Sequence, residues 1–79
     1  MYFVYILRSE KDKNLYIGCT SDMAHRLSQH NAGKVLSTKS RLPFKLIYFE
    51  RFGDKYEAFL TERFYKTVKG KRELLSKLK

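Results

Sequence analysis

The first hydrophobic segment of the chain, residues 2–7, consists of aromatic and aliphatic residues without polar alternation. Such a run is typical of a central strand that is covered on both faces. Polar turn formers fill residues 9–14, and strand-forming residues return at 15–17 before Gly18. The pattern therefore predicts an antiparallel hairpin whose first strand forms the core of the sheet.

A helix is predicted over about residues 22–31, because Thr20, Ser21 and Asp22 can cap its start and Asn31-Ala32-Gly33 can end it. Residues 34–45 are basic and rich in hydroxyl groups, and they contain the only proline of the chain. We expect a basic loop here.

The second half of the chain is predicted to hold one more strand and two helices. Residues 46–50 have strand composition, and Gly53-Asp54 precede a helical segment over about 55–69 that Gly70 would end. Residues 71–79 carry leucines at helical spacing, which predicts a short amphipathic helix. These elements place the chain in the α+β class, as one domain spanning residues 1–79.

The composition narrows the function classes. A single cysteine excludes a disulfide framework and a zinc site of paired thiolates, and it fits a reducing cytoplasm. The apolar run at 2–7 is far shorter than the roughly 20 residues that cross a bilayer, so no membrane role follows. The net charge of +9 makes a polyanion, and nucleic acid first, the expected partner.

Glu62 is the most informative single residue, because it falls in an apolar row of its predicted helix, about 40° from Ala58 and about 60° from Tyr65. A buried carboxylate without a partner is costly, so something must compensate it. One interpretation is an i,i+4 ion pair with Lys66. The other is that Glu62 holds a hard divalent cation through oxygen, with water and a phosphate completing the shell.

Two tyrosines and two basic residues are further candidates. Tyr5 and Tyr16 fall on neighbouring strands, where they are core aromatics or a phenol base that a nearby cation assists. Arg26 is the candidate cation, and it could also bind a phosphate oxygen. His30 either positions a water or a hydroxyl, or only favours the helix dipole. Cys19 has no histidine and acid in triad order and is expected to be a bystander.

In this order and spacing the residues resemble the GIY-YIG nuclease domain, and within it the small stand-alone proteins related to the amino-terminal domain of the nucleotide-excision-repair endonuclease. The resemblance spans nearly the whole chain. It rests on Phe3-Val4-Tyr5, Tyr16-Ile17-Gly18, Arg26, His30 and Glu62, together with Thr38-Lys39-Ser40-Arg41-Leu42-Pro43. It implies a three-stranded antiparallel sheet flanked by helices.

The resemblance also implies residue roles. Glu62 would hold a single Mg²⁺ or Mn²⁺, Tyr16 would act as general base for the attacking water, and Tyr5 would be the hydrogen-bonding partner of Tyr16. Arg26 would steady the transition-state phosphate. His30 would fill a position that family members occupy with His or Tyr. Gly18 would let the backbone approach the site closely, and it is counted among the nucleic-acid-binding residues.

The implied activity is metal-dependent hydrolysis of one phosphodiester strand, with DNA favoured over RNA as substrate. Phosphate contacts are expected from Lys34, Lys39, Arg41 and Lys45. Two alternatives remain open: a nucleic-acid-binding module of the same fold without turnover, and an interaction domain of a larger repair complex. The sequence departs from the family pattern at Cys19, where some catalytic members carry a lysine, and in having no asparagine after Asn31.

Overall fold

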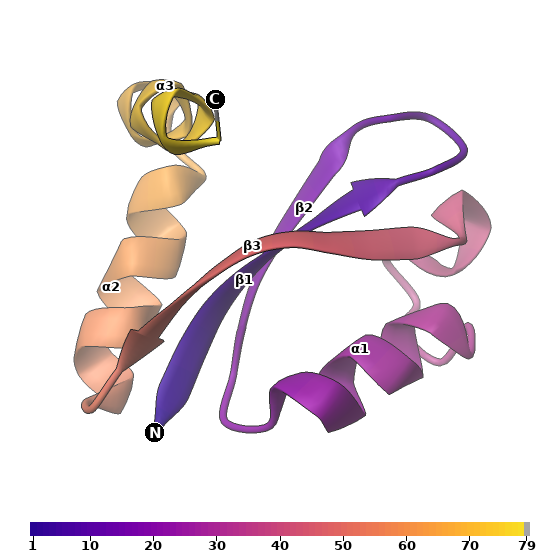
Figure 1. Cartoon of the computed structure of the whole chain (residues 1–79), viewed down its shortest axis with the longest axis horizontal. Helices are drawn as coiled ribbons and strands as arrows, with labels where there is room; N and C mark the ends of the chain where they lie inside the picture. Colours follow the sequence, from indigo (N-terminus) through magenta and orange to yellow (C-terminus); the bar gives the residue numbers. More distant parts are fainter. Residues whose placement is uncertain (79) are drawn as a thin grey trace.

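The computed structural model describes residues 1–78, which form three strands and three α-helices (Figure 1). The strands pair in the order β2-β1-β3, and both pairings are antiparallel. The predicted three-stranded antiparallel sheet flanked by helices is therefore confirmed. In chain order the elements are β1 (Tyr2–Ser9), β2 (Leu15–Thr20), α1 (Met23–Asn31), a short 3₁₀ turn (Lys39–Arg41), β3 (Phe44–Phe52), α2 (Lys55–Tyr65) and α3 (Val68–Lys77).

The central strand β1 sends alternate side chains to two hydrophobic clusters, one on each face of the sheet. Val4 and Ile6 pack with residues of α2 and α3, whereas Tyr5 and Leu7 pack with Phe44 and with residues of α1. Figure 1 shows α1 on one side of the sheet and α2 with α3 on the other. Because both faces are covered, β1 has no polar alternation in its buried part, as the sequence predicted.

α1 begins one residue later than predicted, because Asp22 is its cap and accepts a hydrogen bond from the His25 N–H at 3.1 Å. Its end is fixed to the sheet by Asn31. The side-chain amide of Asn31 donates to the Phe44 carbonyl oxygen at 3.2 Å, and its Oδ1 accepts from the Phe44 N–H at 2.9 Å. This double hydrogen bond sets the position of α1 against β3.

The prediction of one helix over 55–69 that Gly70 ends is wrong. α2 ends at Tyr65, and Thr67 starts a new helix by accepting a hydrogen bond from the Gly70 N–H at 3.0 Å. Gly70 lies buried inside α3, where a side chain would overlap the Phe64 carbonyl. Glycine at this position therefore allows a tight helix–helix corner. The tail helix predicted over 71–79 is the rest of α3, and residue 79 lies outside the described residues.

β3 is longer than predicted and takes the last part of the expected basic loop. Phe44 and Lys45 already belong to this strand, and Phe44 is buried in the cluster on the α1 face. The loop before it contains the 3₁₀ turn and a cis peptide bond between Leu42 and Pro43. Within residues 1–78, no helix has the length and apolar character needed to cross a membrane.

Candidate active site

Tyr5 and Tyr16 lie on the same face of the sheet, the one that α1 covers. In the β1–β2 register Tyr5 is opposite Gly18 and Leu7 is opposite Tyr16, so the two tyrosines are diagonal neighbours. Their ring centroids are 6.4 Å apart. The two phenols, which the sequence placed on neighbouring strands, therefore share one face of the sheet.

The hydroxyl of Tyr5 is fully engaged by two residues of α1. It lies 3.0 Å from Nε2 of His30, and it accepts a hydrogen bond from Nε of Arg26 at 3.4 Å. Burial raises the pKa of the Tyr5 phenol, and the Arg26 hydrogen bond offsets part of that rise. We expected Tyr5 to pair with Tyr16, but within residues 1–78 no hydrogen bond joins the two phenols, because His30 takes the Tyr5 hydroxyl.

The direction of the hydrogen bonds around His30 follows from Thr38. The Thr38 hydroxyl donates to the Val35 carbonyl oxygen at 3.3 Å, so it accepts from Nδ1 of His30 at 2.9 Å. Nε2 of His30 is then the acceptor for the Tyr5 O–H. His30 is fully buried, and burial, together with the charge of Arg26, lowers its pKa, which favours this neutral form.

Thr38 completes this chain of hydrogen bonds, and the sequence analysis gave it no role in the site. It is fully buried although it lies between exposed residues of the basic loop. Its only signal in the sequence was its place in the segment before Pro43 that carried the resemblance. A hydroxyl group in a polar loop does not by itself reveal a buried partner, so Thr38 could not be distinguished from Ser37 and Ser40 in the sequence.

Arg26 stands next to both tyrosines. The hydrogen bond with Tyr5 raises the pKa of the guanidinium, and Tyr16 adds a smaller contribution of the same sign. A second contact joins Nη1 of Arg26 to Oε1 of Gln29 at 3.4 Å. The remaining N–H groups of the guanidinium are available to an anion. The Tyr16 hydroxyl interacts with the same guanidinium, which is the smallest contribution to the raised pKa of Arg26, and it has no other hydrogen-bond partner within residues 1–78.

Gly18 leaves space for the Tyr5 side chain on the neighbouring strand. It is buried opposite Tyr5, and a side chain at this position would overlap the Tyr5 phenol. The missing side chain therefore makes room for Tyr5. A nucleic-acid contact at Gly18 stays a prediction.

Glu62 lies on the other side of the sheet edge. Its helix, α2, packs against the sheet face that carries Val4 and Ile6. The side chain is 16% exposed, and its one ion pair within the described part of the chain joins it to Nζ of Lys66 at 3.1 Å. Hence the i,i+4 pair that the sequence allowed is present. No hydrogen bond links Glu62 to either phenol.

The carboxylate of Glu62 nevertheless reaches the edge strand β2. Glu62 lines a hollow together with Cys19 and Thr20 of that strand. Burial raises the pKa of the Cys19 thiol, and the charge of Glu62 adds to this rise. A smaller contribution of Glu62 also raises the pKa of Tyr5. Glu62 and the tyrosines therefore flank the same strand from opposite faces.

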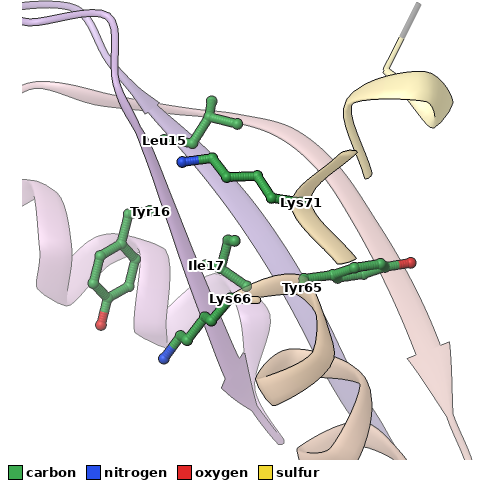
Figure 2. Close-up of a pocket in the computed structure, with 6 residues that line it drawn as sticks. All are labelled: Leu15, Tyr16, Ile17, Tyr65, Lys66 and Lys71. Atoms are coloured by element: carbon green, nitrogen blue, oxygen red, sulfur yellow. The ribbon is translucent and has the colours of Figure 1, made fainter. Parts of the chain in front are cut away.

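A second hollow, of about 240 Å³, opens beside Tyr16 at the junction of α2 and α3 (Figure 2). Two lysines line it, Lys66 and Lys71. In Figure 2 the ammonium group of Lys66 and the hydroxyl of Tyr16 point to the same end of the hollow, and Lys71 lies nearer Leu15. From the sequence, Lys66 was expected only as a partner of Glu62.

The donor set at Glu62 fits a weakly held hard cation. Within residues 1–78 no group of three or more His, Cys, Asp or Glu residues could hold a metal ion. Mg²⁺ is commonly bound through one or two carboxylates, several waters and phosphate oxygens of a substrate. Glu62, at the rim of a hollow, can supply the one carboxylate ligand that such a coordination shell needs from the protein. Water and phosphate oxygens would supply the other ligands.

Three of the four expected phosphate contacts are free on the surface. Lys34, Lys39 and Lys45 are exposed, and no ion pair involves them within residues 1–78. Arg41 is different, because its Nε donates to Asp12 at 2.8 Å and its guanidinium lies over the ring of Phe44. The Arg41 guanidinium lowers the pKa of Asp12 to about 2. Arg41 thus fastens the hairpin loop to the basic loop.

Comparison with known proteins agrees with this architecture. The sequence pattern of the GIY-YIG catalytic domain matches residues 1–75. The chain is 44% identical over 77 residues to the UPF0213 protein spr1390 of Streptococcus pneumoniae, covering 94% of this chain and 77% of that protein. It is 42% identical to the UPF0213 protein YsiG of Lactococcus lactis, covering 99% of this chain and 75% of the relative.

A solved structure shows the same fold. The solution NMR structure of the UPF0213 protein BH0048 from Bacillus halodurans superposes with a TM-score of 0.59 at 35% identity, covering 96% of this chain and 84% of that one. The match of the family pattern extends over both tyrosine motifs, α1 and the helix that carries Glu62. The chain therefore belongs to the GIY-YIG domain family.

Proposed function

We propose that this protein is a metal-dependent endonuclease that hydrolyses one strand of nucleic acid, with DNA as the favoured substrate and Mg²⁺ or Mn²⁺ as cofactor. The observation that carries the proposal is the unequal state of the two phenols. Tyr5 commits its proton to His30 and its oxygen to Arg26, whereas the Tyr16 hydroxyl interacts only with the Arg26 guanidinium and finds no acceptor for its proton within residues 1–78. Tyr16 is thus the phenol that can take a proton from water.

A tyrosine acts as a base where a neighbouring cation assists it, and the Arg26 guanidinium stands next to Tyr16. The same guanidinium has donors left for a non-bridging phosphate oxygen, where charge grows as the phosphodiester bond breaks. One residue therefore assists both the base and the transition state.

His30 and Thr38 act through other residues in this proposal. They hold the Tyr5 hydroxyl in one orientation, and this hydroxyl in turn holds Nε of Arg26. Positioning of this kind is valuable because hydrogen-bond donors that are already aimed need no reorganisation during the reaction.

Glu62 is the residue that would hold the cation, and the exposed Lys34, Lys39 and Lys45 would contact the phosphate backbone. A bound divalent cation supplies Lewis-acid polarisation of a phosphate oxygen. Lysine contacts to phosphate carry no sequence information, so we expect binding without strong sequence preference. A cytoplasmic repair role is part of the proposal, and the single free cysteine is compatible with it.

A nucleic-acid-binding module without turnover is the second candidate, and two observations favour it. Cys19 provides no cation after the second motif, and Lys66 occupies the carboxylate of Glu62. An interaction domain of a larger repair complex is the third candidate. It would bind an acidic protein surface through the same lysines and would show little dependence of DNA affinity on salt.

The deciding experiment incubates supercoiled plasmid with Mg²⁺ or Mn²⁺ and compares the parent with Tyr16→Phe and Glu62→Ala. We expect nicked circles from the parent, a loss of about 10²–10⁴-fold in rate for Tyr16→Phe, and a comparable loss for Glu62→Ala. Binding of the same DNA is measured in parallel. Intact plasmid in all three samples, with equal binding, would establish the binding module instead.

A further inference from the structure

Lys66 stands between the two hollows that flank the edge strand β2. Its Nζ is 3.1 Å from Oε2 of Glu62, which lines the hollow beside Cys19. The same lysine lines the other hollow with Tyr16 and Lys71, and its ammonium points to the end where the Tyr16 hydroxyl lies (Figure 2). Lys66 is therefore paired with Glu62 and also borders the hollow beside Tyr16, which gives its ammonium group a second possible position.

We propose that Lys66 is an exchangeable cation of the site: it pairs with Glu62 when no divalent cation is bound, and it moves to a phosphate oxygen of the nucleic acid in the hollow beside Tyr16 when one is. This inference rests on the proposed function, because it takes Glu62 as the metal ligand and nucleic acid as the ligand of the hollow.

The relative exposure of the two partners makes the exchange feasible. The side chain of Lys66 is 54% exposed and that of Glu62 is 16% exposed, so the lysine is the mobile member of the pair. An exposed ion pair of this type contributes little to stability. A doubly charged cation on the carboxylate oxygen outweighs a single ammonium group at the same distance.

The hollow beside Tyr16 suits the second position. Lys71 adds another positive charge to its lining, and no acidic residue is among the lining residues. An ammonium group released from Glu62 enters a space that already attracts anions. Lysine serves such a role well, since its ammonium is a compact charge on a flexible stem. The cation on Glu62 and the phosphate in the hollow would therefore bind cooperatively.

The test measures binding of a short DNA duplex as a function of salt, with and without Ca²⁺ as a divalent probe, for the parent, Lys66→Met and Lys69→Met. Lys69 is the matched control, because it is exposed on α3 and makes no ion pair within residues 1–78. With Ca²⁺ we expect Lys66→Met to lower the slope of log K against log salt by about 0.9 relative to the parent, the value for one phosphate contact. Without Ca²⁺ that difference should vanish.

A second set of variants frees Lys66 without any metal. Glu62→Gln removes the charge that holds the lysine, so Lys66→Met should weaken cation-free DNA binding about fivefold more in the Glu62→Gln background than in the parent. Such a double-mutant cycle isolates the coupling between the two residues. Lys69→Met in the same background should show no extra loss.

The outcomes separate the exchange from the proposed function. Equal slopes of log K against log salt for Lys66→Met and the parent with Ca²⁺ would overturn the exchange. A slope change that is the same with and without Ca²⁺ would also overturn it, because the lysine would then contact phosphate permanently. In both cases DNA binding and nicking by the parent would stand. Failure of the parent to bind DNA at all would overturn the proposed function and the exchange together.

Discussion

The Tyr5 hydroxyl lies 3.0 Å from Nε2 of His30, 25 positions along the chain, and both side chains are almost completely buried. The bond joins the central strand β1 to the last turn of α1. It is the central link of a chain of hydrogen bonds that starts at Arg26 and runs through Thr38 to the Val35 carbonyl. Because no buried side-chain nitrogen or oxygen in the described residues lacks a partner, removing any member leaves another unsatisfied.

Tyr5→Phe should therefore destabilise the fold. The substitution leaves Nε2 of His30 without a donor and Nε of Arg26 without an acceptor, which costs about 1–3 kcal/mol. Urea unfolding followed by circular dichroism measures the loss. Tyr56→Phe, an exposed tyrosine on α2, is the control and should change stability by less than about 0.5 kcal/mol. A Tyr5→Phe protein as stable as the control would show that the hydrogen bond contributes nothing net.

Tyr16→Phe should leave stability nearly unchanged and lower the nicking activity. The Tyr16 hydroxyl interacts within residues 1–78 only with the partly exposed Arg26 guanidinium, so its loss should leave the free energy of unfolding within about 0.5 kcal/mol of the parent. Nicking should fall by about 10²–10⁴-fold if Tyr16 is the base. Unfolding and plasmid nicking are measured on the same preparation. A strongly destabilised Tyr16→Phe variant would indicate a structural role for this hydroxyl.

Stability should fall on acidification because the pKa of His30 is lowered in the folded protein, by burial first and by Arg26 second. Below the unfolded-state pKa of about 6.5 the unfolded chain binds a proton that the folded chain does not. The free energy of unfolding should therefore drop with a slope of up to about 1.4 kcal/mol per pH unit as pH falls below that value. Above it, His30 contributes no pH dependence.

Urea unfolding between pH 5 and pH 8 tests this dependence. Substitution of His30 by Gln should abolish the part of the slope that appears below about pH 6.5. Substitution of His25, an exposed residue on the same helix, by Gln should leave that part intact. Identical slopes for the parent and the His30 variant would show that another group carries the dependence.

Gly18→Ala should destabilise the protein by displacing the Tyr5 side chain. A methyl group at this position would overlap the Tyr5 phenol, which cannot move without giving up His30. We expect a cost of about 1–3 kcal/mol, as for other overpacked cores. Gly53→Ala is the matched control, because nothing lies within 4 Å of a methyl group there. Equal stability of the two variants would contradict the close packing of Tyr5 on Gly18.

The loop cations should differ in their effect on DNA binding. Lys39→Ala removes an exposed charge and should lower the slope of log K against log salt by about 0.9. Arg41→Ala should change that slope less, because Asp12 already neutralises this guanidinium. Salt titrations of DNA binding with both variants measure the difference. A larger slope change for Arg41→Ala would mean that the ion pair with Asp12 opens on binding.

Local chemistry was sufficient to predict much of the fold. The unbroken apolar run over 2–7 predicted a covered central strand, and the three possible caps at residues 20–22 predicted the start of α1 to within a residue, because both depend on neighbours in sequence. The same reasoning failed at Gly70. A glycine after a helical segment reads as a helix end, yet here it allows α3 to pack against the Phe64 carbonyl. That close approach exists only once two helices have met.

The sequence by itself determined the strand and helix order, the positive surface and the shared face of Tyr5 and Tyr16, since strand periodicity and charge are local properties. Only the tertiary structure decided which side chains contact one another. It joined Tyr5 to His30 rather than to Tyr16, buried Thr38, engaged Arg41 with Asp12 and placed Lys66 between Glu62 and the hollow beside Tyr16. These relationships depend on how α1 and α2 cover opposite faces of the sheet, and helix packing against a distant strand leaves no periodic signal in a sequence.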